Sequence, residues 1–217
     1  MTITNFWLIR HGETSWNAER RLQGWQDIPL NEVGIAQANE LAAYLASNPL
    51  DITFDLLVSS DLKRASQTAE IACAHMGLDL ILEPGLRERG FGIWEGRSWD
   101  SFGETGPDQP GANTQDLDHA VEGAESIRKF QDRVIGSFEA LARKSPEQNI
   151  IVFAHGGVID MVWRKLHNVD LNTPRTERIL NASINHFSLH ALSNSYEWRV
   201  RNWAQTQHVE KALDDIG

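Results

Sequence analysis

The chain has 217 residues, with 30 acidic and 20 basic side chains, a net charge of −10 and 41% hydrophobic residues. A hydrophobic fraction of this size argues against a disordered chain, and the shortage of Lys and Arg disfavours a nucleic-acid partner, whose phosphates need a basic surface. We expect no signal peptide, because the first residues lack a basic segment followed by a long apolar run. No apolar stretch reaches the ~18 residues that a membrane span needs, so we expect a cytoplasmic protein without a membrane partner.

The first element is an apolar segment, residues 3–9, which is short and partly β-branched and therefore predicts a buried strand. It ends in Arg10, His11 and Gly12. Ligands of open α/β sheets bind at the carboxyl ends of the strands. His11 is therefore a candidate nucleophile and Arg10 a candidate anion-binding group, the alternative being a turn that happens to hold both residues.

A polar loop and a helix follow this strand. Residues 16–30 are rich in turn formers, which predicts an ordered loop of the kind that often carries binding groups. Asn31 is a candidate helix cap, and apolar residues at helical spacing continue to Leu45, so one face of this helix packs on the sheet. The Asn48-Pro49 pair is predicted to end the helix, because residues before proline avoid helical angles.

The next unit is a strand over residues 55–60, which ends in two serines and leads into a helix from Asp61. This helix carries Arg64 in its first turn, where the helix dipole prefers acidic residues. A residue that breaks a local rule is a candidate for function. The alternative is a surface Arg64 that pairs with Asp61 or Glu70.

Two acidic residues, Glu88 and Glu95, lie among glycines and aromatic residues after a predicted strand at 78–82. A carboxylic acid beside aromatic rings can be held protonated, which suits a proton donor. Glu88 lies closer to the strand and is the preferred candidate; the alternative is that both acids pair with neighbouring arginines. Residues 98–122 then contain several Gly and Pro but no Lys or Arg, which predicts a loop that is either a functional lid or a flexible insertion.

A long helix is predicted from Glu125 to Lys144, and the strand after it, residues 149–154, ends in His155 and Gly156. This strand repeats the design of the first one. Two strands that end in His-Gly, with an Arg-bearing helix start between them, indicate a site more strongly than either strand alone. We expect the three ends to meet at one edge of the sheet.

The last predicted elements are a helix over residues 158–166 and a hairpin of strands at 184–192 and 196–203, followed by a polar tail that we expect to be loosely held. The alternation of strands and helices predicts an α/β fold whose mostly parallel sheet is covered on both faces. Cys73 is the single cysteine and lies in an apolar helical pattern, which predicts a packed core thiol and excludes an intrachain disulfide.

The candidate residues suit phosphoryl transfer. They are two guanidinium groups, two imidazoles and a carboxylate: Arg10, Arg64, His11, His155 and Glu88. A phosphoryl group needs cationic donors around its oxygens, an in-line nucleophile and an acid for the leaving oxygen. Arginine matches phosphate geometry, and a neutral imidazole can attack phosphorus. This set needs no metal and no other cofactor, although the two histidines as a metal-binding pair are a minor alternative.

Residues 8–14, which include Arg10-His11-Gly12, resemble the signature of the histidine phosphatase superfamily, also called the phosphoglycerate mutase-like family. The similarity covers most of residues 3–190 in the family's order and continues through these further segments: 16–17, 23–25, 59–65, 86–88, 95–96 and 154–157. The resemblance implies a three-layer α/β/α sandwich. We therefore expect residues 1–217 to form one domain, with an insertion or lid around 98–122.

The resemblance also implies roles for individual residues. His11 is the phosphorylated nucleophile, Glu88 is the acid and base, and Arg10, Arg64 and His155 form the phosphate pocket. The site is further lined by the following residues: Thr14, Asn17, Gln23, Gly24 and the backbone of Gly156. The resemblance implies no metal and no cofactor, and it suggests a homodimer.

The branch of the family is indicated by two features. Cofactor-dependent mutases usually have His-Gly-Asn where this chain has His155-Gly156-Gly157, and they carry an insertion with Lys and Arg after the acid, whereas residues 98–122 have no Lys or Arg. We therefore predict a metal-independent phosphomonoesterase that hydrolyses small phosphorylated metabolites through a phosphohistidine. The lack of basic residues suggests a leaving group with few extra negative charges. The alternatives are a phosphoglycerate mutase and a non-catalytic module that binds phosphate or a phosphoprotein.

Overall fold

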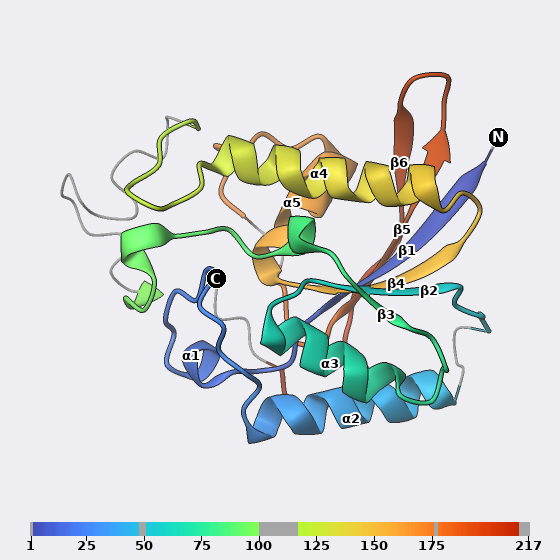
Figure 1. Ribbon diagram of the computed structural model, residues 1–217, viewed down its shortest axis with the longest axis horizontal. Coiled ribbons are helices and arrows are strands. Elements are labelled where there is room, and N and C mark those ends of the chain that lie inside the picture. The colour runs from blue at the N-terminus through green and yellow to red at the C-terminus, as the bar shows by residue number, and fades with distance from the viewer. Residues whose placement is uncertain (1, 48–50, 100–116, 176–177, 213–217) are drawn as a thin grey trace.

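The computed structural model describes residues 2–47, 51–99, 117–175 and 178–212. Within these residues, six strands form one sheet in the order β3-β2-β4-β1-β5-β6 (Figure 1). The strands are β1 (Ile3–Arg10), β2 (Leu56–Ser59), β3 (Leu80–Leu82), β4 (Asn149–Ala154), β5 (Ile184–Ala191) and β6 (Tyr196–Gln205). β1 to β4 are mutually parallel, whereas β5 is antiparallel to both of its neighbours. The mostly parallel sheet and the C-terminal hairpin are both confirmed.

Helices cover both faces of this sheet, so the predicted three-layer α/β/α sandwich is confirmed (Figure 1). α2 and α3 lie on one face, and α4 and α5 lie on the other. The helices are α1 (Ser15–Ala18), α2 (Glu32–Ala46), α3 (Lys63–Cys73), α4 (Ile127–Lys144), α5 (Gly156–His167) and the 3₁₀ turns η1 (Pro84–Leu86) and η2 (Gly92–Trp94). None of the helices in the described ranges is both long and apolar enough to cross a bilayer.

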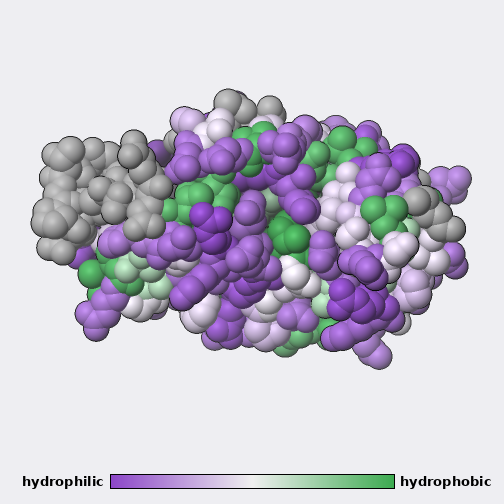
Figure 2. Space-filling model, turned by 90° about the horizontal axis from the view of Figure 1, so that it is seen from above, coloured by the Kyte–Doolittle hydropathy of each residue, from purple (hydrophilic) through white to green (hydrophobic). Residues whose placement is uncertain are grey.

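The central strand β1 shows why the sheet is covered twice. Phe6 and Leu8 belong to the core beneath α4 and α5, while Trp7 and Ile9 belong to the core beneath α2 and α3. Successive strand residues point to opposite faces, so a strand that is apolar at every position needs a helical layer on each side. The face that carries α4 is mainly hydrophilic, with its apolar residues in small separate groups, as on an ordinary protein surface (Figure 2).

Several predicted boundaries change for local reasons. The Asn31 side chain accepts a hydrogen bond from Gly34 N (2.8 Å), which confirms the helix cap. α4 begins at Ile127 rather than at Glu125, because Ser126 caps it and Glu125 instead pairs with Arg133 (2.6 Å). The predicted third strand shortens to Leu80–Leu82.

Other expectations concern Cys73, the tail and the loops. Cys73 is buried, and burial raises the pKa of its thiol to about 12, as expected for a core residue. The described part of the tail, up to residue 212, is held more closely than expected, because Gln37 Nε2 donates to the Lys211 carbonyl (2.8 Å). The predicted helix end at Asn48-Pro49 and most of the predicted lid at 98–122 lie outside the described residues, so the lid stays a prediction.

The aromatic cluster beneath α4 generates a prediction about stability. Phe138 is fully buried, and its ring centroid lies 5.3 Å from those of Phe6 and Phe187. Phe138→Ala should lower the free energy of unfolding by about 3–5 kcal/mol, because it removes this packing and leaves a cavity. Urea denaturation measures the loss. Val33→Ala, at a position that is 40% exposed on α2, is the control and should change stability by less than about 0.5 kcal/mol. Similar losses in both variants would contradict this account of the core.

Candidate active site

The candidate residues meet where three parallel strands end. The pairing of β1 with β4 sets Arg10 beside Ala154, so the next residues, His11 and His155, come side by side. Their ring centroids are 5.2 Å apart, and the rings are tilted by 60°. β2 lies on the other side of β4 and ends at the same edge. The prediction that these strand ends converge is confirmed.

His11 is held as one tautomer. Its Nδ1 lies 2.6 Å from the Gly12 carbonyl oxygen. A carbonyl can only accept, so Nδ1 carries the proton and Nε2 keeps its lone pair. The ring is buried, and burial, followed by the charges of Arg64 and Arg10, holds the pKa of His11 well below its usual value. His11 is therefore neutral at pH 7.

Arg64 is 1% exposed and is the central cation of the site. Its Nε donates to His155 Nδ1 (3.2 Å), and its two terminal nitrogens donate to the carbonyls of Gly24 and Gln26 (2.9 Å each). The guanidinium group therefore joins the first turn of α3 to β4 and to the polar loop. Arg10 is equally buried and donates to the Ile179 carbonyl.

The alternative of a surface Arg64 is wrong. Asp61 instead binds Arg87, whose Nε donates to Asp61 Oδ1 over 2.7 Å. That ion pair holds the pKa of the Asp61 carboxyl below its usual value, the hydrogen bond from Arg87 being the main cause. From the first turn of α3, the Arg64 guanidinium group reaches the His155 ring and two carbonyls of the polar loop, so it faces inward instead of toward solvent.

His155 takes the opposite tautomer to His11. Because Arg64 donates to its Nδ1, the proton lies on Nε2, which donates to Ser60 Oγ (2.8 Å). Burial, followed by the charge of Arg64, holds the pKa of His155 well below its usual value, so this ring is also neutral. Ser60 orients His155 and was not among the predicted site residues; its position at the end of a strand was the available signal.

Glu88 is fixed by backbone groups. Its Oε1 accepts from Arg89 N (2.7 Å) and its Oε2 from Gly157 N (2.9 Å), at the start of α5. A Cβ added at Gly157 would lie 2.1 Å from Glu88 Oε1. The glycine after Gly156 is therefore needed for the carboxylate to reach this position.

Glu95, the second acidic candidate, holds a loop. It accepts hydrogen bonds from Trp25 N (2.9 Å) and Phe91 N (3.1 Å). Gly24 lies directly before Trp25 with a positive φ of 52°, and a Cβ there would lie 2.1 Å from Glu95 Oε1. Glu95 therefore fixes the loop whose Gly24 carbonyl binds Arg64.

A small pocket of about 30 Å³ lies among these groups. Most of the predicted site residues line it: Arg10, His11, Asn17, Gln23, Gly24, Arg64 and Glu88. Three further lining residues were not predicted: Arg21, Phe91 and Trp99. Arg21 belongs to the polar loop over residues 16–30, which the sequence predicts to carry binding groups. Phe91 and Trp99 are distinguished in the sequence only by being aromatic.

The remaining predicted residues lie next to this pocket. His155 packs against His11, and Gly156 lines an adjoining hollow. Thr14 is fully buried and caps α1: its Oγ1 accepts from Asn17 N (3.1 Å) and donates to Gln23 Oε1 (3.0 Å). Thr14 therefore positions two pocket residues instead of lining the pocket.

The adjoining hollow has a volume of about 220 Å³ and shares Glu88, Phe91 and Trp99 with the small pocket. It extends along the start of α5 and the start of α4. Glu88 lies at the junction of the two spaces, where a carboxyl group could reach an oxygen that bridges them.

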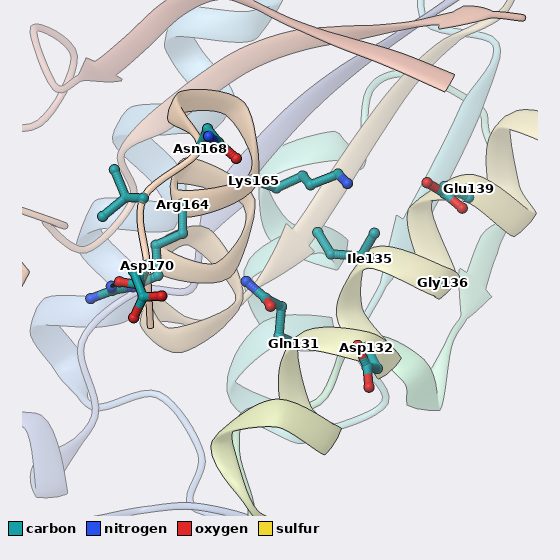
Figure 3. Close-up of a pocket in the computed structure, with 10 residues that line it drawn as sticks. Gln131, Asp132, Ile135, Gly136, Glu139, Arg164, Lys165, Asn168 and Asp170 are labelled. Carbon is teal, nitrogen blue, oxygen red and sulfur yellow. Dashed lines mark hydrogen bonds between the residues drawn. The ribbon is translucent and has the colours of Figure 1, made fainter. Parts of the chain in front are cut away.

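A larger hollow, of about 590 Å³, lies between α4 and α5, with Gln131 and Asp132 on one side and Lys165 on the other (Figure 3). None of the predicted site residues lines it. Within the described ranges, no group of three or more His, Cys, Asp and Glu side chains could hold a metal ion. The pair of His11 and His155 thus gains no third ligand there.

Comparisons with known proteins agree with this geometry. The family model of the histidine phosphatase superfamily (branch 1) matches residues 6–206. Phosphoglycerate mutase-like protein 4 of Arabidopsis thaliana is 34% identical over 208 residues, which are 94% of this chain and 86% of that protein. Metal-independent phosphoserine phosphatase of the same plant is 32% identical over 210 residues, which are 95% of this chain and 84% of that protein.

The fold also superposes on a solved structure over nearly the whole length of both chains. A phosphoserine phosphatase of Entamoeba histolytica, a mutant in complex with phosphoserine, superposes with a TM-score of 0.78 and 27% identity, covering 95% of this chain and 99% of that chain. The family model matches residues 6–206, and the two strands that end in His-Gly pair side by side. The chain belongs to the histidine phosphatase superfamily (branch 1).

Proposed function

We propose that this protein is a metal-independent phosphomonoesterase that hydrolyses small phosphorylated metabolites through a phosphohistidine on His11. One observation carries the proposal. His11 is a neutral imidazole whose tautomer leaves a lone pair on Nε2, and it is buried beside the guanidinium groups of Arg10 and Arg64. A nucleophile with cationic donors around it is the arrangement that attack on a phosphate ester requires.

The reaction then has two steps. Arg10 and Arg64 bind the phosphoryl oxygens, and His155 completes the pocket. His11 Nε2 attacks phosphorus, and the P–N bond forms while the P–O bond to the leaving group breaks; Glu88 in its acid form gives its proton to that oxygen. In the second step Glu88 takes a proton from water, whose oxygen attacks phosphorus and breaks the P–N bond to release phosphate.

The relatives support this reading. One is a phosphoserine phosphatase that is independent of metal, and another is a phosphoserine phosphatase in complex with phosphoserine. A phosphohistidine intermediate is typical of the family. The other roles implied by the resemblance, the single domain over 1–217, the homodimer and the cytoplasmic location stay predictions from the sequence.

His11→Asn should abolish turnover, with a loss on the order of a thousandfold or more, because it removes the nitrogen that attacks phosphorus. The neighbouring His155 ring has both of its nitrogens in hydrogen bonds to Arg64 and Ser60. Phosphate release from p-nitrophenyl phosphate in the presence of a metal chelator measures the effect. Enzyme is also incubated with a substrate that carries a radiolabelled phosphate and is quenched in alkali, where a phosphoramidate survives. The wild-type protein should then retain labelled phosphate, and His11→Asn should not. His167→Asn, at an exposed residue near the end of α5, is the matched control and should keep full activity.

The same preparation separates the alternatives. Turnover that persists in His11→Asn would refute the covalent mechanism. Isomerisation of 3-phosphoglycerate that depends on 2,3-bisphosphoglycerate would identify a mutase, whereas free phosphate identifies a phosphatase. Phosphate binding by wild-type protein without any turnover would identify a non-catalytic module.

The protonation states of the two histidines can be measured directly. At pH 6.5 a free imidazole is half protonated. Because burial and Arg64 hold the pKa of His11 and His155 well below that value, both rings should be neutral there, with the proton of His11 on Nδ1 and that of His155 on Nε2. Imidazole ¹⁵N shifts, assigned with His11→Asn and His155→Asn, check this. A protonated His11 ring at pH 6.5 would contradict its role as the nucleophile.

Gly157→Ala should displace Glu88, because the new Cβ would lie 2.1 Å from Glu88 Oε1. We expect kcat to fall on the order of 10- to 100-fold for an alkyl phosphate, which needs a proton donor, and less for p-nitrophenyl phosphate, whose leaving group needs little protonation. Inhibition by inorganic phosphate should barely change. Gly136→Ala, on α4 with open space around the new Cβ, is the matched control. Equal losses for both esters would argue against Glu88 as the acid.

A further inference from the structure

The hollow of about 220 Å³ beside the small pocket is where a leaving group would lie. If the phosphoryl group occupies the small pocket, as the proposed function requires, the rest of the ester must pass Glu88, which both spaces share. Pockets for drug-sized ligands have volumes of about 300–1,000 Å³, so this hollow favours a smaller group. Its lining therefore indicates the substrate class.

Asp160, on α5, contributes a carboxylate to this lining. Its Oδ2 accepts from Arg164 Nε (2.9 Å), but its buried Oδ1 has no hydrogen-bond partner among the residues that the structure describes. The side chain is only 15% exposed. A buried carboxylate oxygen without a donor is costly, so a ligand that supplies a donor gains free energy here.

Cationic groups lie in the same hollow. Arg89 and Arg175 line it, and the charge of Arg175 acts on the Asp160 carboxyl. Burial raises the pKa of Asp160, while the cations of Arg164 and Arg175 oppose that rise. These two lining arginines lie outside residues 98–122, the segment from which the sequence suggested a leaving group with little negative charge. The hollow thus offers one acceptor and two cationic groups beside apolar side chains such as Phe130 and Met161.

We propose that this hollow binds a leaving group with both an ammonium and a carboxylate, the ammonium at Asp160 and the carboxylate at Arg175. A phosphorylated α-amino acid is the substrate class that carries both groups within a short distance of the ester oxygen. An ammonium group has three donors, so it can satisfy Asp160 Oδ1. A guanidinium group binds a carboxylate through two parallel hydrogen bonds.

A set of four esters tests the proposal on the wild-type enzyme. O-phosphoserine carries both groups, 3-phosphoglycerate has a hydroxyl in place of the ammonium, phosphoethanolamine lacks the carboxylate, and p-nitrophenyl phosphate lacks both. We expect kcat/KM for O-phosphoserine to exceed that for each partial analogue on the order of tenfold or more, because each analogue lacks one of the two charged groups that the hollow would bind.

Two variants assign the groups. Asp160→Asn keeps the shape and can still accept from Arg164, but it removes the charge. It should lower kcat/KM on the order of 10- to 100-fold for the two amines and leave 3-phosphoglycerate and p-nitrophenyl phosphate within about threefold. Arg175→Gln should lower kcat/KM for the two carboxylates and spare phosphoethanolamine. Asp132→Asn, an exposed acid that lines the other hollow (Figure 3), is the matched control and should change none of the four.

The outcomes separate this inference from the proposed function. An equal loss on all four esters in Asp160→Asn would assign Asp160 a merely structural role through Arg164 and overturn the inference. A wild-type preference for 3-phosphoglycerate would make the occupant a hydroxyl acid and also overturn it, while the phosphatase would stand. No turnover of any ester would overturn the proposed function itself. If Asp160→Asn fails to fold, the order of kcat/KM for the four esters on the wild-type enzyme tests the inference by itself.

Discussion

The buried guanidinium group of Arg64 is the interaction on which the site depends. It binds the carbonyls of Gly24 and Gln26 and the ring of His155, so it ties the polar loop to the end of β4. Its charge, after burial itself, also keeps the pKa of both histidines low. The same cation therefore positions the pocket and keeps His11 a neutral imidazole, which the proposed attack on phosphorus requires.

The sheet supplies the second constraint. Parallel pairing of β1 with β4, and of β4 with β2, brings three chain segments to one edge even though His11 and His155 are far apart in sequence. The strands can take these central positions because apolar cores lie on both of their faces. Burial at this edge then removes water from the histidines, which makes each nearby charge more effective than it would be on an exposed surface.

Two glycines leave space for the two carboxylates of the site. Gly157 leaves space for Glu88, and Gly24 leaves space for Glu95, so each carboxylate reaches backbone N–H groups that a side chain would block. The two acids looked alike in the sequence, and the structure separates them. Glu88 lies at the junction of the two spaces, whereas Glu95 fixes the loop that binds Arg64.

The sequence by itself determined a mostly parallel sheet covered on both faces, because apolar periodicity and the alternation of strands and helices report burial. It also predicted that His11, Arg64 and His155 meet at one sheet edge, because they follow strands or begin a helix there. The assigned roles of these residues, and the further residues that line the site, came from the resemblance to the family. The sequence could not show that Thr14 hydrogen-bonds to the pocket residues Asn17 and Gln23, or that Ser60 orients His155. It also could not show that Arg89, Asp160 and Arg175 line one hollow beside Glu88. Those facts depend on distances between segments that are remote in sequence. Side-chain burial and hydrogen-bond partners arise only when the helices pack on the sheet, so the tertiary structure decided them.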